Sequence, residues 1–431
     1  MTTKPRVAVL SAARTPFTKA GGPQKRIPAY ELGRVALREA LERSGVAGGD
    51  LGEVILGNIA GPAEATNIAR VIALRAGIPQ SVPAYTVNRN CASALQAVAE
   101  GFLRIRAGTE SLVAVGGAES MSQVPLFFPE SAKDKLEQVQ RAKSLPERVA
   151  AFAAFRPADF KPVIGLLLGL TDNYCGLNMG ETAEVLAREW NIPREEQDAF
   201  ALASHQRASA AQKSGRLARE IVPVPQRPKL DGFVSEDVGI RHEQSMPALA
   251  KLKPVFDRRY GSVTAGNSSQ ITDGAGALIL ASDAEATRRG LKPLGYIRAA
   301  HFAGLDPARM GLGPAYATAR LLERESMELR SIGLVEMNEA FAAQVLANLR
   351  AFTSLAFARE SLGRNTVLGE IDPARLNVNG GAIALGHPVG ATGARLVQTL
   401  LLEMADRDVE LGLVTLCVGG GQGAALLLER A

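Results

Sequence analysis

Short apolar segments alternate with amphipathic segments along this chain, and this alternation constrains the fold more than any other feature. In the first third, apolar runs that predict strands are separated by segments whose apolar residues recur about every 3.6 positions, which predicts helices. The predicted strands cover residues 6–10, 53–56, 84–87 and 111–115, and the predicted helices cover residues 29–44, 66–76 and 92–98. Such an order predicts an α/β fold with a mostly parallel sheet covered by helices.

The same order of segments returns in the last third of the chain. Strands are predicted at residues 333–337, 376–379 and 411–416, and helices at residues 315–325, 339–350 and 391–404. The pair Val87-Asn88 and the pair Val378-Asn379 occupy equivalent places in the two series. We interpret this as an internal duplication that gives two α/β halves related by a pseudo-twofold axis.

The middle of the chain has a different pattern. Proline and charged residues are frequent there, and a predicted helix at 194–214 has no strand partner. We expect an inserted domain that covers one face of the first half and carries binding residues. The predicted division is residues 1–122 plus 250–285 for the N-terminal half, 123–249 for the inserted loop domain, and 286–431 for the C-terminal half.

Composition excludes several classes of function. A net charge of +5 comes without a run of Lys and Arg interleaved with aromatic residues, so we expect no nucleic acid partner. Three cysteines in 431 residues form neither a disulfide framework nor a metal-ligand spacing, which indicates a reducing compartment and no metal site. The first predicted strand leaves no room for a leader, and no apolar run approaches the ~20 residues that span a bilayer. We therefore expect a cytoplasmic protein without a transmembrane segment.

Two of the three cysteines stand in settings that suit reactive sulfur. Cys91 directly precedes a predicted helix, where unpaired backbone N–H groups and the helix dipole lower a thiol pKa and favour a nucleophile. Burial as a small apolar residue is the alternative, and it is the commoner fate of a single free cysteine. Cys417 ends a predicted strand and precedes three glycines, so its thiol is expected at the carboxyl end of that strand.

Three further residues fit chemistry at a thioester. His387 lies between glycine-rich segments that let backbone approach a ligand, and a histidine fixed there can accept a proton from a cysteine. The alternative for His387 is a structural role in its turn. Gly419 offers a backbone N–H to an oxyanion, and Asn338 ends its own predicted strand with an amide side chain. All these positions are strand or helix ends, so one cleft could contain them.

Four sequence segments closely resemble the thiolases. They are NRNCASALQA at 88–97, NEAFA at 338–342, NVNGGAIALGHPVGATGARL at 377–396 and CVGGGQGAA at 417–425. Residues 250–280 are also similar to the thiolase segment that closes the first half, and the resemblance covers nearly the whole chain outside residues 123–175. It implies a five-layer αβαβα thiolase fold with two duplicated halves and a loop domain inserted in the first half.

The resemblance also implies a role for each of these residues. Cys91 matches the nucleophile that becomes acylated, and His387 matches the base that activates it. Together with Asn338 and a water, His387 matches an oxyanion hole for the thioester oxygen. Cys417 matches the acid and base at the α-carbon of acetyl-CoA, and the N–H groups of Cys91 and Gly419 match a second oxyanion hole.

The same resemblance extends to the substrate contacts. Ser269 matches a contact to the pantetheine of coenzyme A, and Met179 and Phe341 match acyl-pocket residues. Arg241 and Phe256 lie in stretches similar to those that line the mouth of the coenzyme A site. No metal or redox cofactor is implied, because coenzyme A (CoA) acts as a substrate.

The expected activity is acyl transfer between 3-ketoacyl-CoA and CoA by a ping-pong mechanism. The alternatives are a short-chain biosynthetic acetyl-CoA acetyltransferase, a decarboxylating condensing enzyme of the superfamily, and an inactive lipid-carrier homologue. Condensing enzymes usually have His where this chain has Cys417. Residues 312–323 resemble the branch that acts with a hydratase/dehydrogenase partner chain, although that branch often has His in place of Asn338. The resemblance also implies a homodimer or a homotetramer.

The inserted segment contains three apolar stretches, at residues 126–128, 152–155 and 164–168. We expect them to form the core of the insert. The alternatives are that they line a long acyl tunnel or that they meet a partner chain or a membrane surface. The preferred length of the acyl chain stays open.

Overall fold

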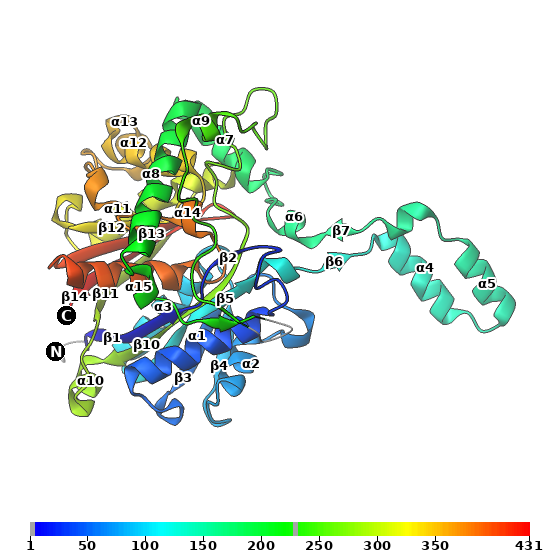
Figure 1. The fold of residues 1–431 in the computed structure, drawn as a ribbon, viewed down its shortest axis with the longest axis horizontal. Helices are drawn as coiled ribbons and strands as arrows, with labels where there is room; N and C mark the ends of the chain where they lie inside the picture. The colour runs from blue at the N-terminus through cyan, green and yellow to red at the C-terminus, as the bar shows by residue number, and fades with distance from the viewer. Residues whose placement is uncertain (1–4, 227–231) are drawn as a thin grey trace.

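A ten-stranded mixed sheet runs through the computed structural model, which describes residues 5–226 and 232–431 (Figure 1). Residues 1–4, on which part of the expectation about a leader depends, lie outside the described residues. The strands of the N-terminal half are β1 (Val7–Arg14), β2 (Thr18–Lys19), β3 (Glu53–Gly57), β4 (Ala84–Val87), β5 (Leu112–Ser120) and β10 (Thr272–Ser282). The strands of the C-terminal half are β11 (Gly295–Gly304), β12 (Leu334–Met337), β13 (Leu411–Val418) and β14 (Gln422–Arg430).

The two halves repeat one pattern of strand pairing. In the N-terminal half β3 pairs in parallel with β4 and β5, and β5, β10 and β1 follow in antiparallel pairs. In the C-terminal half β12 pairs in parallel with β13 and bridges through Val335 to Leu376, and β13, β14 and β11 follow in antiparallel pairs. An antiparallel pairing of β1 with β11 joins the halves. The duplication is confirmed, whereas the expectation of a mostly parallel sheet is wrong because the strands around this junction all run antiparallel.

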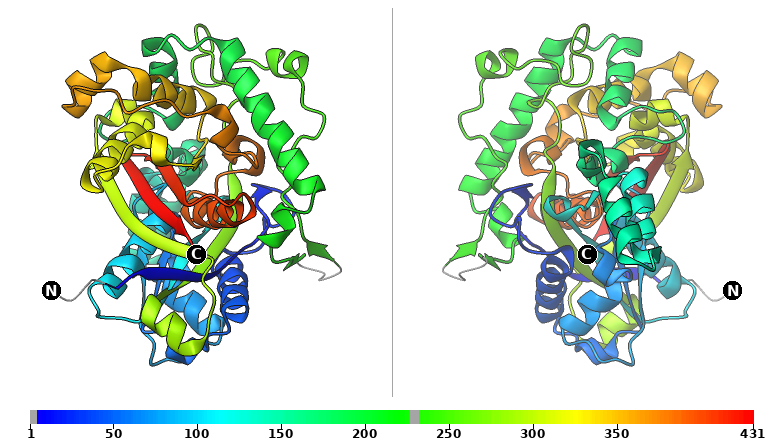
Figure 2. Two further views of the ribbon diagram at one scale, coloured as in Figure 1. Left: turned by 90° about the vertical axis from the view of Figure 1, so that its left-hand side faces the viewer. Right: turned by 90° about the vertical axis from the view of Figure 1, so that its right-hand side faces the viewer.

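Helices cover both halves of the sheet and fill the space between them (Figure 2). The N-terminal outer layer contains α1 (Ala29–Ser44), α2 (Ile68–Arg75) and α10 (Asp283–Arg289). The central layer contains α3 (Ser93–Arg106) and α15 (Thr392–Asp406), and the C-terminal outer layer contains α11 (Gly313–Arg324) and α12 (Ala342–Thr353). Along β1, Val7 and Val9 pack toward the central layer while Ala8 and Leu10 pack toward the outer layer, as the period of two in a strand requires. The five-layer α/β architecture is therefore confirmed.

Several element boundaries differ from the sequence prediction, among them the end of β5 and the segment at 376–379. β5 does not end at Gly116-Gly117 but continues to Ser120, because these glycines let neighbouring backbone approach closely. A Cβ atom at Gly116 would lie 2.1 Å from the Gly276 carbonyl oxygen, and one at Gly117 would lie 2.0 Å from the Gly390 carbonyl oxygen. The segment predicted as a strand at 376–379 forms only the single bridge at Leu376.

The insert packs mainly on the C-terminal half. The expectation that it covers a face of the first half is therefore wrong. Its helices α7 (Met179–Glu189) and α8 (Arg194–Lys213) pack on α12, and α8 also packs on α14 (Ala382–Leu385). A buried ion-pair cluster ties the insert to the N-terminal half, in which Arg14 of β1 contacts Glu220 at 2.8 Å and Asp237 at 2.7 Å. The insert thus bridges both halves around the ends of their strands.

Part of the insert forms an arm that projects from the rest of the molecule (Figure 1). The arm consists of the ribbon β6 (Leu126–Phe127) and β7 (Val163–Ile164) and the helices α4 (Glu130–Arg141) and α5 (Leu145–Ala153). The expectation that its apolar stretches form a core is wrong, since Phe128 is 62% exposed and Phe152 is 60% exposed. A pair of helices without a third packed layer has no interior in which to bury both faces. Throughout residues 5–226 and 232–431, none of the helices has the combined length and hydropathy needed to cross a membrane.

Candidate active site

Cys91 lies in a tight turn between β4 and α3. Asn90 adopts a left-handed conformation with φ of +44°, and its N–H donates to Asn88 Oδ1 at 3.0 Å. The Ser93 N–H donates to the Asn90 carbonyl oxygen at 2.9 Å, and α3 begins at Ser93. The thiol therefore stands just before the helix and not within its first turn.

Cys417 lies near the end of β13, opposite Gly423 of β14. The hairpin between these strands contains Gly420 with φ of +86° and Gly421 with φ of +73°, values that favour glycine. Asn90 Nδ2 donates to the Gly419 carbonyl oxygen at 2.8 Å. This hydrogen bond holds the turn that carries Cys91 against the hairpin that carries Cys417.

Both thiols are held in their protonated form. Burial raises the pKa of Cys91, while the N–H groups of Gly419 and of Cys91 itself point to the sulfur and act in the opposite direction. Burial also raises the pKa of Cys417, and negative charge on Cys91 raises it further, so the two sulfurs lie within electrostatic reach of each other. The predicted lowering of the Cys91 pKa is wrong, because desolvation outweighs the backbone N–H groups at a site that precedes the helix.

His387 is a neutral imidazole with a defined tautomer. Its Nδ1 lies 2.6 Å from Thr392 Oγ1, and that hydroxyl donates its only hydrogen to the Pro388 carbonyl oxygen at 3.1 Å. The hydroxyl must therefore accept from Nδ1–H, which leaves Nε2 without a proton. Burial lowers the pKa of His387 to about 3, and the Arg395 guanidinium lowers it further. A base with a free Nε2 is thus present throughout the neutral pH range.

Asn338 faces the free nitrogen of His387. Asn338 Nδ2 lies 3.4 Å from His387 Nε2, and the Asn338 N–H donates to the Thr415 carbonyl oxygen of β13 at 2.9 Å. The side chain is fully buried, and its Oδ1 has no hydrogen-bond partner among the described residues. Asn338 is therefore tied to the strand of Cys417 and to the imidazole at once.

A close helix contact brings the cysteine turn and the histidine loop together. Gly393 in the first turn of α15 approaches α3 so closely that a Cβ atom there would lie 2.5 Å from the Leu95 nitrogen. Cys91 precedes α3 and His387 precedes α15, so the packed ends of these helices set both residues at one place. The site thus combines residues of both halves of the molecule.

The predicted acyl-pocket residues pack in one apolar cluster with Cys417. Met179 and Phe341 share this cluster with Phe256, the residue predicted at the mouth of the coenzyme A site, and the rings of the two phenylalanines meet edge to face with centroids 6.1 Å apart. A Cβ atom at Gly419 would lie 3.2 Å from Met179 Sδ. The buried members of the cluster are Ala183, Ala187, Val263, Met310, Ala340, Phe341, Ala343 and Cys417.

The two remaining predicted residues differ in their relation to the site. Ser269 is half-buried, and its N–H donates to the Ala340 carbonyl oxygen at 2.9 Å, next to Phe341. Arg241 is exposed, and its N–H donates to His205 Nδ1 at 3.1 Å. In the described part of the chain, Arg241 makes no hydrogen bond or ion pair with any of the other predicted site residues.

Sequence reasoning missed the residues that hold His387 in place. Thr272 Oγ1 accepts from the His387 N–H at 3.1 Å, and Thr392 holds the imidazole. Thr392 could have been found, because it follows His387 by five residues at the predicted start of a helix. Thr272 lies far away in the sequence, and its part in the site depends on the packing of β10 against the loop.

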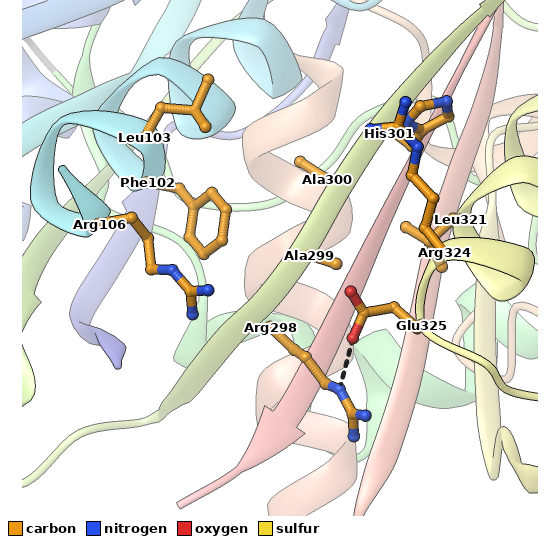
Figure 3. A pocket seen from close by; sticks show the side chains of 10 residues that line it. All are labelled: Phe102, Leu103, Arg106, Arg298, Ala299, Ala300, His301, Leu321, Arg324 and Glu325. Atoms are coloured by element: carbon orange, nitrogen blue, oxygen red, sulfur yellow. Dashed lines mark hydrogen bonds and ion pairs between the residues drawn. The ribbon is translucent and has the colours of Figure 1, made fainter. Parts of the chain in front are cut away.

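A separate surface pocket has a volume of about 210 Å³ and lies among α3, β11 and α11 (Figure 3). Its polar lining includes Arg106, His301 and Arg298, and Arg298 pairs with Glu325 at 2.9 Å. This pocket contains no cysteine and none of the predicted site residues. The candidate site is therefore the one around Cys91, Cys417 and His387, and not this surface pocket. Within the described ranges, no group of three His, Cys, Asp or Glu side chains could hold a metal ion.

The chain matches two family models along almost its entire length. The model "Thiolase, N-terminal domain" matches residues 7–284, and the model "Thiolase, C-terminal domain" matches residues 291–430. The 3-ketoacyl-CoA thiolase of Yersinia enterocolitica is 42% identical over 425 residues, which cover 98% of this chain and 97% of that protein. The 3-ketoacyl-CoA thiolase of Yersinia pestis is 41% identical, with the same coverage.

Solved structures are similar over the full chain. The Bacillus anthracis acetyl-CoA acetyltransferase has a TM-score of 0.87 and 36% identity, with 100% of both chains covered. The human mitochondrial 3-ketoacyl-CoA thiolase, solved in complex with CoA, has a TM-score of 0.86 and 35% identity, with 99% of this chain and 98% of that chain covered.

Proposed function

Because this chain belongs to the thiolase family, we propose that it is an acyltransferase that moves acyl groups between 3-ketoacyl-CoA and CoA. The observation that carries this proposal is geometric: the Asn90–Gly419 hydrogen bond joins the turn of Cys91 to the hairpin of Cys417, and Asn338 joins the strand of Cys417 to His387. One thiol can form a covalent bond while the other exchanges a proton, which is the division of work that carbon–carbon cleavage next to a thioester needs.

The first step forms the acyl-enzyme. His387 Nε2 takes the proton of the Cys91 thiol, directly or through a water, and the sulfur attacks the C3 ketone carbon of the substrate. The N–H groups of Cys91 and Gly419 stabilise the resulting oxyanion. These N–H groups point to the Cys91 sulfur, which supports a role next to the carbon that this sulfur attacks.

The second step breaks the bond between C2 and C3. The electron pair passes to C2, and Cys417 donates its thiol proton to that carbon, so acetyl-CoA leaves as a neutral product. The high pKa of Cys417 keeps its proton available at neutral pH. His387 and a water held by Asn338 stabilise the enolate oxygen while it carries charge, and the unpartnered Asn338 Oδ1 supports this role.

The third step regenerates the enzyme. The Cys417 thiolate takes the proton of an incoming CoA thiol, whose sulfur attacks the acyl carbon on Cys91. Cys91 leaves as a thiolate and recovers its proton from His387. The products are an acyl-CoA shortened by two carbons and the free enzyme, and the reverse sequence is a Claisen condensation.

We assign the substrate contacts to the residues around this centre. Met179 and Phe341 line the acyl group, since both pack with Cys417. Ser269 contacts pantetheine from the segment next to the Phe341 loop, and Phe256 and Arg241 lie at the mouth of the CoA site. The exposure of Arg241 suits an ion pair with a CoA phosphate at the surface.

A direct assay of cleavage tests the function. The purified enzyme is mixed with acetoacetyl-CoA and CoA, and acetyl-CoA is quantified by mass spectrometry. We expect turnover by the wild type and none by Cys91→Ser, whereas Cys175→Ser serves as a matched control because Cys175 lies outside the proposed machinery. Equal activity of wild type and Cys91→Ser would refute the assignment.

The alternative function is a short-chain acetyl-CoA acetyltransferase that makes acetoacetyl-CoA. It is supported by the similarity to the Bacillus anthracis structure, whereas the relatives of higher identity are named 3-ketoacyl-CoA thiolases. Rates of thiolysis for acetoacetyl-CoA and 3-ketopalmitoyl-CoA distinguish the two functions. Cleavage of both substrates supports the broader 3-ketoacyl-CoA function, and cleavage of acetoacetyl-CoA alone supports the alternative.

The assembly and the location of the chain are part of the same proposal. We propose a homodimer or homotetramer in the cytoplasm that works with a hydratase/dehydrogenase partner chain. The proposed units are residues 1–122 plus 250–285, residues 123–249 and residues 286–431. Light scattering on the purified chain tests the assembly, since a monomeric mass at working concentrations contradicts it.

A further inference from the structure

Glu119 is a buried carboxylate next to the candidate site. It has no role in the proposed reaction steps. It lies near the end of β5 with no exposed surface. Its Oε1 accepts from Asn58 Nδ2 at 3.1 Å and from the Ala60 N–H at 3.2 Å, and its Oε2 accepts from the Ile59 N–H at 3.0 Å and from the Gly390 N–H at 3.1 Å. No Lys, Arg or His among the described residues forms an ion pair with it.

These four donors come from both halves of the molecule. Three follow β3 in the N-terminal half, and the fourth, Gly390, belongs to the loop between His387 and Thr392 in the C-terminal half. A Cβ atom at Gly390 would lie 2.5 Å from Glu119 Oε2, so only glycine leaves room for this contact. The carboxylate therefore fastens the histidine loop to the strand ends of the opposite half.

Glu119 also occupies the place that corresponds to Cys417 in the duplicated fold. Gly57 ends β3 and pairs with Gly117, and Met337 ends β12 and pairs with Thr415. Glu119 and Cys417 each stand two residues beyond these pairs. At equivalent strand ends, the C-terminal half thus has the thiol proposed to exchange a proton, and the N-terminal half has a carboxylate.

The carboxylate is close to the nucleophile as well. Its charge raises the pKa of the Cys91 thiol, which requires the two groups to lie within electrostatic reach. Burial raises the pKa of Glu119 to about 7, while its hydrogen-bond donors oppose that rise. A buried charge without a cationic partner costs free energy of folding. The presence of such a group next to a reactive thiol therefore indicates a function for Glu119.

We propose that Glu119 is a positioning residue of acyl transfer, which holds the loop of His387 against the ends of β3 and β5 through the Gly390 N–H. The proposal rests on the proposed thiolase function, and it deepens that function by naming what sets the base relative to the nucleophile. Glu119 touches neither substrate nor the reacting atoms in this account. It acts through the loop, and His387 in its Nδ1–H tautomer is the group that depends on it.

Two variants break the contact from opposite sides. Glu119→Gln keeps the shape of the side chain but turns an NH₂ group toward N–H donors. Gly390→Ala keeps the carboxylate and fills the space in front of Oε2. Glu403→Gln is the control, because Glu403 is a buried carboxylate near the opposite end of α15 that accepts from Arg216 and Asn379.

Two readouts separate positioning from general loss of structure. The first is the steady-state rate of acetoacetyl-CoA thiolysis, measured at a temperature where circular dichroism shows each variant fully folded. We expect Glu119→Gln and Gly390→Ala to lower kcat about tenfold, as the loss of one hydrogen bond to a charged group would do, with the KM for CoA little changed. The second is the ¹⁵N–¹H imidazole spectrum of ¹⁵N-histidine enzyme, in which only four histidines contribute.

In the wild type we expect His387 as the neutral Nδ1–H tautomer at neutral pH. Both variants should shift it toward a mixture of tautomers, and Glu403→Gln should not. An unchanged His387 signal in both variants, or the same shift in Glu403→Gln, overturns the proposal. If Glu119→Gln does not fold, Gly390→Ala alone decides. A wild type without thiolysis activity refutes the proposed function, while the imidazole spectra still test the positioning.

Discussion

The hydrogen bond between His387 Nδ1 and Thr392 Oγ1 gives the sharpest prediction about the chemistry. Thr392→Val keeps the shape of the side chain and removes the hydroxyl, so the buried Nδ1–H loses its acceptor at 2.6 Å. Thr392→Ser keeps the hydroxyl and is the matched control. In the proposed acylation step the imidazole takes the Cys91 proton and becomes positively charged, so this hydrogen bond should strengthen during that step.

The magnitude follows from that change in charge. A neutral hydrogen bond contributes about 1 kcal/mol and one to a charged group about 1.5–3 kcal/mol, so the transition state loses about 0.5–2 kcal/mol more than the ground state. Acylation should therefore slow by about 2- to 30-fold in Thr392→Val. The variant also loses the hydrogen bond to the Pro388 carbonyl oxygen, and its free energy of unfolding should fall by about 1–3 kcal/mol.

The assay is a single-turnover experiment. Enzyme in excess is mixed with acetoacetyl-CoA, quenched with acid at successive times, and the acyl-enzyme fraction is measured by intact-protein mass spectrometry. Urea unfolding confirms that each variant is folded under these conditions. Equal acylation rates for Thr392→Val and Thr392→Ser would refute the claim that His387 acts through a fixed Nδ1–H tautomer.

Three further predictions concern the neighbouring groups. Cys417→Ser should slow thiolysis by about 10²- to 10⁴-fold, the usual contribution of a general acid. It should slow single-turnover acylation from acetyl-CoA much less, because the CoA thiolate leaves more readily than a carbanion, and equal loss in both assays contradicts the proposed roles. Asn90→Gly keeps the positive φ but loses the hydrogen bond to Gly419, so kcat should fall about 2- to 10-fold. An unchanged kcat would show that this hydrogen bond between the cysteine loops does not contribute to catalysis. The low pKa of His387 means that this histidine binds a proton below pH 6.5 in the unfolded chain but only near pH 3 in the folded chain. Acidification should therefore destabilise the wild type relative to His387→Asn, and urea midpoints measured at a series of pH values test this.

The regular elements of the sheet halves could be predicted from local patterns. The range 29–44 with apolar spacing near 3.6 is the range of α1, and the apolar run 84–87 is β4. β5 extended beyond its prediction because Gly116 and Gly117 serve close backbone approach, which a local pattern cannot distinguish from a strand end. The exposure of the apolar residues in the arm could not be predicted from local patterns either, since an apolar stretch does not indicate whether a third layer will cover it.

The residues of the site were selected from motifs, and their roles stay predictions. The structure places Cys91, Cys417, His387 and Asn338 together through contacts between segments far apart in the sequence. The motifs could not predict the balance of desolvation and hydrogen bonding at Cys91. That balance reverses the expected shift of the Cys91 pKa. Nor could they give Thr272 and Glu119, whose contacts to the histidine loop exist only in the packed molecule.

The central claim is that Cys91 carries the acyl group and Cys417 does not. Peptide mass spectrometry after brief incubation with acetyl-CoA tests it most directly, because the mass of each cysteine peptide reports its own modification. The account predicts one acetyl group per chain on the peptide of Cys91, removed when CoA is added, and an unmodified peptide of Cys417. An acetyl group on Cys417, or no adduct on Cys91 in folded enzyme, would contradict it.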